Sequence, residues 1–227
     1  MTIYRPYHVL TVALLAAMLP LSASAQRNAG MNDPQARFEF GAAVSGSFYD
    51  ARSLSSLAGR GEAGFKSGLG GSIWLGQDMY EHVSGELRYD YLQNQMRVAG
   101  MGEETSFRAR SHAFHYDLHF NLAGRSAGVR PYFLVGGGVK YFEGTGALDA
   151  NRPLQSFALL NRATEMKPLF SIGAGLKFRL SDHVSMRLEF RDNMTAFPRK
   201  VITPTESTVS GAWIHNFVPS VGVGLIF

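Results

Sequence analysis

The chain has 227 residues and carries 22 lysines and arginines against 18 aspartates and glutamates, a formal net charge of +4. This excess is small and dispersed, which argues against nucleic acid as a partner. Cysteine is absent, so disulfide frameworks and thiolate-based zinc or redox sites are excluded. Glycine is abundant, at 25 residues, and aromatic residues make up 12%, a combination typical of strands joined by tight turns.

The first 25 residues have the layout of a secretory signal peptide. One cation, Arg5, precedes the apolar stretch 9–19, and the small residues 23–25 follow it. The apolar stretch has 11 residues, and a helix needs roughly 18 to 20 to cross a bilayer. The sequence therefore predicts an exported precursor with a signal peptide at 1–25 and a mature chain of one domain at 26–227.

Beyond the signal peptide, glycine or a charged residue interrupts every apolar run, which argues against transmembrane helices. The runs alternate with period two, as strands do when one face is apolar and the other polar. In residues 184–191, for example, Val, Met, Leu and Phe alternate with Ser, Arg, Glu and Arg. This template predicts eight strands, at residues 36–49, 66–77, 83–94, 106–122, 130–142, 167–180, 184–193 and 212–227.

The connections between the predicted strands alternate in length. The short ones lie at residues 78–82, 123–129 and 181–183, and the long ones at 50–65, 95–105, 143–166 and 194–211. Outer-membrane barrels have short turns in the periplasm and longer loops outside. The sequence therefore predicts an all-β fold, an eight-stranded antiparallel up-and-down transmembrane β-barrel in the bacterial outer membrane.

The two faces of the predicted strands differ sharply. The presumed lipid face contains Phe38, Phe40, Val44, Phe48, Leu87, Tyr89, Tyr91, Phe114, Tyr116, Leu118, Phe120, Phe133, Val135, Val139 and Tyr141. The lumen face contains Glu39, Glu86, Arg88, Asp90, His115, Asp117, His119, Lys140, Lys177, Arg179, Arg187, Glu189 and Arg191. Because eight strands enclose only enough space for side chains, we expect an interior salt-bridge network and no wide aqueous pore.

The chain resembles the OmpA-like small outer-membrane β-barrels along nearly the whole of residues 26–227. The resemblance lies in Arg130 to Phe133 followed by the glycines 136–138, in residues 173–177 and in residues 180–190. The chain ends at the last predicted strand, so we expect the barrel domain without the peptidoglycan-binding domain of full-length members. The resemblance also implies that the alternating end, Val223, Leu225 and Phe227, is the signal read by the barrel-assembly machinery during insertion.

Histidines on the segment 106–122 suggest a metal site. Residues two apart in a strand share a face, so His115, Asp117 and His119 would point into the lumen and His112 away from it. At about 3.3 Å per residue, His115 and His119 are some 13 Å apart, too far to bind one ion. We therefore expect these residues to belong to the packed network, and we predict no metal and no cofactor.

Some eight-stranded barrels are enzymes that modify lipid A. Lipid A deacylases carry a His-x-Ser-Asn motif, which is not present here, and the candidate at 215–217 supplies no hydroxyl. A palmitoyltransferase would use His, Asp and Ser from long loops, but the long loops contain no histidine. The loop residues weighed for this role are Asp149, Ser156, Ser207 and Ser210. We predict that the protein is not an enzyme and has no catalytic residues.

The predicted long loops, together with the strand ends beside them, are rich in basic residues that could meet lipopolysaccharide phosphates at the outer leaflet. They are Arg52, Arg60, Arg97, Arg108, Arg110, Arg152, Arg162, Lys167, Arg199 and Lys200. Interspersed acids make a plain solvated rim an equal alternative: Glu103, Glu104, Asp149, Glu165 and Glu206. We expect a structural or surface-interaction role with outer-membrane lipid as a partner; the alternatives are a narrow channel for small or apolar solutes and a lipid A-modifying enzyme.

Overall fold

The computed structural model describes residues 37–56, 59–146, 154, 156–205, 207–209, 211 and 213–227. The predicted signal peptide, residues 1–25, lies outside the described residues. The chain divides into two units, Met1–Gln35 and Ala36–Phe227, and the strands of the described residues belong to the second. The described part of the chain contains no helix with the length and apolar character needed to cross a membrane.

The described residues form thirteen strands. These are β1 (Phe38–Tyr49), β2 (Arg52–Ser56), β3 (Gly59–Asp78), β4 (Val83–Gly100), β5 (Glu103–Asn121), β6 (Val129–Gly144), β7 (Ala158–Leu160), β8 (Thr164–Arg179), β9 (Val184–Ala196), β10 (Ile202–Pro204), β11 (Ser207–Val209), β12 (Trp213–Ile214) and β13 (Asn216–Ile226).

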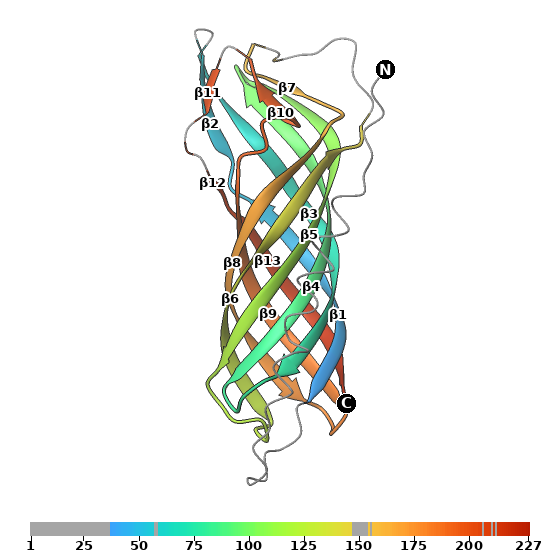
Figure 1. Ribbon diagram of the computed structural model, residues 1–227. Coiled ribbons are helices and arrows are strands. Elements are labelled where there is room, and N and C mark those ends of the chain that lie inside the picture. Colours follow the sequence, from blue (N-terminus) through green and yellow to red (C-terminus); the bar gives the residue numbers. More distant parts are fainter. Residues whose placement is uncertain are drawn as a thin grey trace, which may run out of the picture. The chain divides into compact units, whose positions relative to one another are not determined.

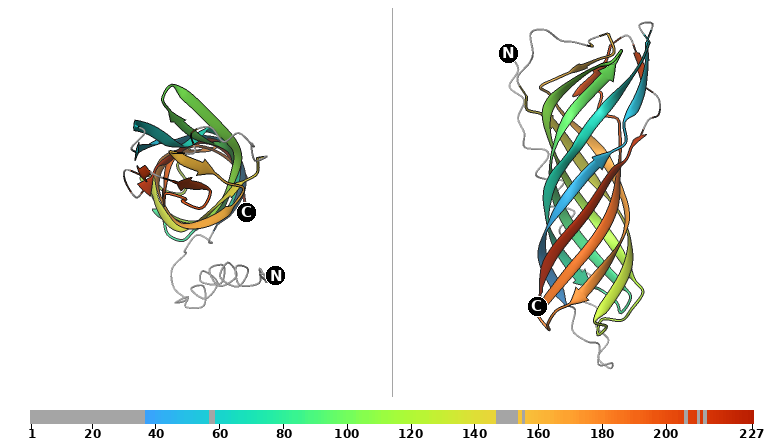
Figure 2. Two further views of the ribbon diagram at one scale, coloured as in Figure 1. Left: turned by 90° about the horizontal axis from the view of Figure 1, so that it is seen from above. Right: turned by 180° about the vertical axis from the view of Figure 1, so that it is seen from behind.

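Eight of these strands close into a ring (Figures 1 and 2). Around the ring the order is β1, β13, β9, β8, β6, β5, β4 and β3, and the pairing of β3 with β1 completes it. All neighbours are antiparallel, and the main chains of Phe38 and Phe227 exchange two hydrogen bonds of 2.9 Å where the first and last strands meet. The predicted eight-stranded antiparallel barrel is therefore confirmed.

One end of the barrel carries short turns, between β3 and β4, β5 and β6, and β8 and β9; we call it the short-turn end. The opposite end is the long-loop end. There β7 pairs with β10 in a separate two-stranded sheet, which crosses the mouth of the ring in the view from above (Figure 2).

Several strands extend farther than the sequence predicted. The expected long loop at 95–105 is wrong, because β4 and β5 continue as a paired hairpin to a turn at Met101 and Gly102. Both turn residues have positive φ, 51° and 82°, as a tight hairpin turn requires. The expected loop at 50–65 likewise contains β2 and the first residues of β3.

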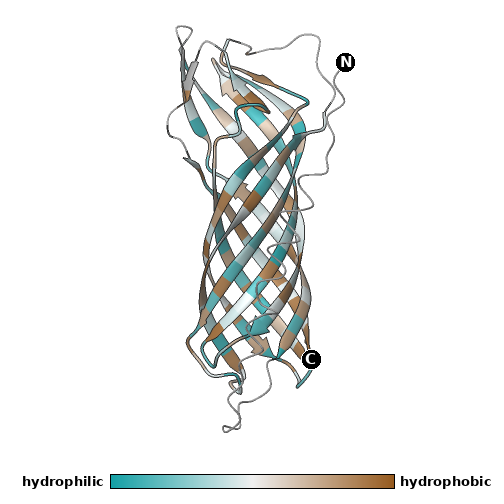
Figure 3. Cartoon of the chain, in the orientation of Figure 1, coloured by the Kyte–Doolittle hydropathy of each residue, from teal (hydrophilic) through white to brown (hydrophobic). Residues whose placement is uncertain are grey.

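A reversal of polarity explains this error. On β4, the inward residues change from charged to apolar toward the long-loop end, where Met96 and Val98 are fully buried. The outward residues there become polar, with Gln93 and Gln95 exposed. Figure 3 shows the alternation of hydrophilic and hydrophobic residues along the strands. The alternation with period two persists along the strand, but the apolar residues now point inward and the polar residues outward. A sequence pattern that requires charged residues on the inner face therefore does not recognise this part of the strand.

The barrel interior consequently has two layers. The layer toward the short-turn end is charged, and the layer toward the long-loop end is an apolar cluster that the sequence analysis did not anticipate. Its buried members are Leu54, Ala63, Phe65, Met96, Val98, Phe107, Ala109, Phe142, Leu154, Phe157, Ala158, Phe197, Val201, Ile202 and Ile214.

Candidate functional site

The charged layer is built by three strands whose alternate residues point inward. Strand β4 contributes Glu86, Arg88 and Asp90; β5 contributes His115, Asp117 and His119; β9 contributes Arg187, Glu189 and Arg191, and all nine are buried. The outward residues between them are apolar, so the register places every charge of these segments inside the ring.

Glu86 is the centre of this network. Its Oε1 lies 2.9 Å from Nε of Arg88 and 3.2 Å from Nη2 of Arg191, and its Oε2 pairs with Arg187. One carboxylate from β4 thus contacts three guanidinium groups. Such a group is stabilised in a low-dielectric interior only because its charge is matched by neighbours at hydrogen-bond distance.

Arg191 extends the network around the lumen. Its Nη1 lies 2.6 Å from Oδ2 of Asp117, and its Nε lies 2.5 Å from Oε1 of Glu189. Glu189 also accepts a 2.6 Å hydrogen bond from the hydroxyl of Tyr132 and pairs with Arg88 at 3.0 Å. These contacts connect strands β4, β5, β6 and β9 through side chains alone.

His115 lies between two carboxylates. Its Nε2 is 2.9 Å from Oδ2 of Asp90, and its Nδ1 is 3.0 Å from Oδ2 of Asp117. An imidazole with both nitrogens against carboxylates is held as a double hydrogen-bond donor. The ring therefore contributes to the charge balance of the layer.

A second tier lies closer to the short-turn end. Arg187 pairs with Glu39 through Nη2 at 2.9 Å, and Lys177 pairs with the same carboxylate. Ser185 donates a 2.7 Å hydrogen bond to Glu39. Arg179, half-buried at the end of β8, donates to the main-chain carbonyl of Arg125.

Lys140 lies apart from the other predicted lumen residues. It is fully buried, and its Nζ lies 4.9 Å from the ring centroid of Tyr49 and 5.5 Å from that of Phe142. It therefore contacts aromatic faces at the boundary of the apolar layer, and not the carboxylates of the charged layer.

The sequence analysis missed Trp74 as a member of the charged layer. The guanidinium carbons of Arg187 and Arg88 lie 4.7 Å and 5.1 Å from its ring centroid, a cation–π arrangement. A signal was present in the sequence, because period two places Trp74 on the same face as Ser72 and away from Ile73 and Leu75.

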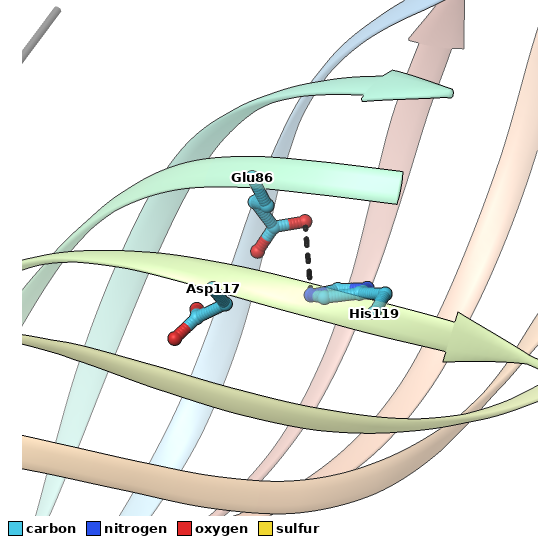
Figure 4. Close-up of side chains that lie close together, drawn as sticks. All are labelled: Glu86, Asp117 and His119. Atoms are coloured by element: carbon cyan, nitrogen blue, oxygen red, sulfur yellow. Dashed lines mark ion pairs between the residues drawn. The ribbon is translucent and has the colours of Figure 1, made fainter. Parts of the chain in front are cut away.

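Glu86, Asp117 and His119 come close enough to suggest a cation site (Figure 4). One potential ligand atom from each lies within 4.8 Å of the others. The carboxylates are, however, already in contact with Arg88, Arg187 and Arg191. His119 stacks on Tyr132, with centroids 4.8 Å apart. Three guanidinium groups at this distance make the cluster unfavourable for a further cation.

The residues weighed for catalysis lie only partly within the described chain. Asp149 and Ser210 lie outside the described residues. His215 pairs with Asp192 of β9 at 2.7 Å and stacks on Phe217 of β13. Both partners belong to strands of the barrel wall.

Histidine followed two positions later by serine occurs twice, at residues 82–84 and 183–185, each without the asparagine of the deacylase motif. Both lie at the short-turn end. The hydroxyl of Ser84 donates to Asp78 at 2.6 Å, and that of Ser185 donates to Glu39. Each hydroxyl is therefore part of the lumen network.

The residues expected to form the insertion signal lie at the end of the barrel wall. Val223 and Leu225 point outward from β13, and they and Phe227 are exposed. Phe227 stacks on Phe38, with centroids 6.1 Å apart. The recognition of these residues during insertion stays a prediction.

A closed ring with an apolar outer surface and a charged, filled interior defines a transmembrane β-barrel of the small outer-membrane class. The chain belongs to the family described as outer membrane protein beta-barrel domain, whose model matches residues 11–227. It is therefore a bacterial outer-membrane barrel. No curated protein matches the chain.

Solved structures show the same fold at low sequence identity. OprG of Pseudomonas aeruginosa has a TM-score of 0.58 and 14% identity, covering 84% of this chain and 95% of that one. Neisserial surface protein A has a TM-score of 0.53 and 13% identity, covering 83% and 96%. A major outer membrane protein of Thermus thermophilus has a TM-score of 0.51 and 11% identity, covering 84% and 99%.

Proposed function

We propose that this protein is a closed outer-membrane barrel with a structural or surface-interaction role. The observation that carries the proposal is the interior, in which Glu86 contacts three guanidinium groups and an apolar cluster fills the long-loop end. A lumen filled by paired charges has no continuous water path. Specificity then belongs to the loops, which a rigid barrel holds at the cell surface.

The partners in this proposal follow from the two surfaces. The outward apolar side chains contact membrane lipid, with Val44 66% exposed and Phe133 57% exposed. At the long-loop end, the cations Arg108, Arg162 and Arg199 are exposed, and in this proposal they contact lipopolysaccharide phosphates. We also propose that a signal peptide, cleaved after residue 25, directs export of the protein. The barrel-assembly machinery then inserts the barrel into the membrane.

Single-channel conductance in a planar bilayer tests the closed lumen. We expect negligible conductance from the unmodified protein. The double variant Arg187→Ala and Glu189→Ala removes partners of Glu39, Glu86, Arg88 and Arg191 in the charged layer. Because the apolar layer closes the barrel separately, conductance should rise most when Phe157→Ala and Phe197→Ala are added.

The matched control removes an arginine–glutamate pair that lies outside the lumen. Arg97 and Glu104 pair at 2.8 Å on the β4–β5 hairpin, so Arg97→Ala with Glu104→Ala should leave conductance at the unmodified level. Steady conductance from the unmodified protein would overturn the proposal and make a narrow conduit for small solutes the better function.

A further inference from the structure

A cavity of about 40 Å³ lies at the short-turn mouth of the barrel, below the charged layer. Its lining is strongly biased toward positive charge. The cationic side chains are Arg37, Arg125, Arg130, Lys177, Arg179 and Arg187. Only three acidic side chains, Glu39, Asp78 and Glu86, line the same cavity in the described part of the chain.

The three carboxylates are already shared among several cations. Asp78 holds Arg130, with Nη1 at 3.0 Å from Oδ1 and 3.1 Å from Oδ2. Glu39 holds both Lys177 and Arg187. Glu86 is shared with Arg187 and with two arginines deeper in the lumen. Leaving Arg125 aside, five cationic side chains and three acids line the mouth, so its lining carries an excess of positive charge.

Main-chain carbonyls accept hydrogen bonds from two of the other arginines. Arg179 donates from Nη2 to the main-chain carbonyl of Arg125. Arg125 donates from Nη2 to the main-chain carbonyl of Asp78 at 3.2 Å. These bonds hold two arginine side chains at one rim of the cavity, with Arg37 exposed at the opening.

We propose that this cavity binds a small oxyanion, of the size of phosphate or a single carboxylate, from the periplasmic side. Guanidinium groups match the geometry of such anions with paired N–H donors. By the same measure a water molecule needs about 10–15 Å³, so 40 Å³ admits a group of only a few heavy atoms.

The position inside the barrel wall favours a free anion over a lipid headgroup. The cavity is lined by inward residues such as Glu39, Glu86 and Arg187, which are buried in the ring. Headgroups of the inner leaflet lie around the outside of the barrel. A soluble anion reaches the mouth directly from the periplasm.

The test titrates inorganic phosphate into the protein refolded in a zwitterionic detergent, with chloride keeping the ionic strength constant. Calorimetry should give saturable binding. Arg179→Gln and, separately, Arg37→Gln should each weaken it about tenfold, the scale of losing one charge-assisted hydrogen bond. Lys66→Gln also removes one positive charge, at a position outside the cavity, and should leave binding unchanged.

Arg37 is exposed at the start of β1, so its variant keeps the proposal testable if Arg179→Gln does not fold. Absence of saturable binding, or equal weakening in the Lys66→Gln control, would overturn the proposal. A further arm uses bilayers with and without phosphatidylglycerol. If that lipid abolishes phosphate binding, the site belongs to a lipid headgroup and the free-anion proposal is wrong.

Discussion

Arg191 of β9 and Asp117 of β5 meet inside the barrel with Nη1 2.6 Å from Oδ2, and both side chains are fully buried. Strands β9 and β5 are not neighbours in the ring, since β8 and β6 separate them. The pair therefore connects two parts of the wall that main-chain hydrogen bonding leaves apart. Glu189 and Glu86 contact the same guanidinium, so Arg191 supports three carboxylates at once.

Replacing Arg191 with Met should destabilise the barrel by about 3–5 kcal/mol, because removing one partner leaves buried carboxylates uncompensated. The measurement is the free energy of unfolding by urea of the protein folded into phospholipid vesicles. Arg199→Met, at an exposed position between β9 and β10, is the control and should cost less than about 0.5 kcal/mol. Equal stabilities of the two variants would contradict a supporting role for the network.

Gly136 on β6 should tolerate no side chain. A Cβ there would overlap Oδ1 of Asp117 and the main-chain oxygen of Tyr116, which would push Asp117 away from Arg191. We expect Gly136→Ala to cost about 1–3 kcal/mol, as overpacking does. Gly137 points to the lipid, and its nearest neighbour for a Cβ is 3.6 Å away.

Gly137→Ala is therefore the matched control for Gly136→Ala in the same unfolding measurement. The two changes add one methyl group to adjacent residues on opposite faces of β6. If Gly137→Ala were the more harmful of the two, the packing of Asp117 against β6 would not be the constraint that selects glycine.

The sequence predicted the ring and its eight strands because both follow from period-two alternation and turn spacing. In Val184 to Arg191 every second residue is charged or hydroxylated, and the structure buries Arg187, Glu189 and Arg191. Local pattern is sufficient here because the side-chain direction in a strand is fixed by position alone.

The partners of each charge could not be predicted in the same way. Arg187 and Glu189 are two residues apart on one face, yet Arg187 pairs with carboxylates of β1 and β4. Glu189 pairs with Arg88 of β4 as well as with Arg191 of its own strand. Pairing across a lumen depends on barrel tilt and register, which are properties of the whole ring. The apolar layer was missed for a related reason, since Met96 and Val98 point inward at the level where the outer surface becomes polar.

Val44 lies near the middle of β1 on the outward face and is 66% exposed. In a bilayer this side chain faces lipid, so Val44→Arg should cost about 2–4 kcal/mol in the urea unfolding measurement. Gln95→Arg is the control, because Gln95 points outward on the hairpin above the apolar band and should change stability by less than about 0.5 kcal/mol. Similar costs at both positions would contradict the assignment of the apolar band to the membrane.

Glu104 on the β4–β5 hairpin, outside the membrane-spanning part of the barrel, should titrate below its ordinary value. The hydrogen bond from Lys66 lowers its pKa from 4.5, and the hydrogen bond from Arg97 adds to the effect. Nζ of Lys66 lies 2.5 Å from Oε1, and Nε of Arg97 lies 2.8 Å from Oε2. A carboxylate with a lowered pKa stabilises the folded hairpin above pH 4.5, and this contribution is lost as the pH falls through the folded-state pKa.

Carbon-13 NMR of the Glu104 carboxyl group should show this lowered pKa directly. The side chain is exposed, so about 1 M salt should move the pKa back toward 4.5 by screening. Lys66→Met should do the same at low salt, because it removes the first of the two hydrogen bonds. If neither salt nor Lys66→Met changed the pKa of Glu104, the ion pairs at the hairpin would not form in solution. The hairpin above the membrane would then be held only by its main-chain hydrogen bonds.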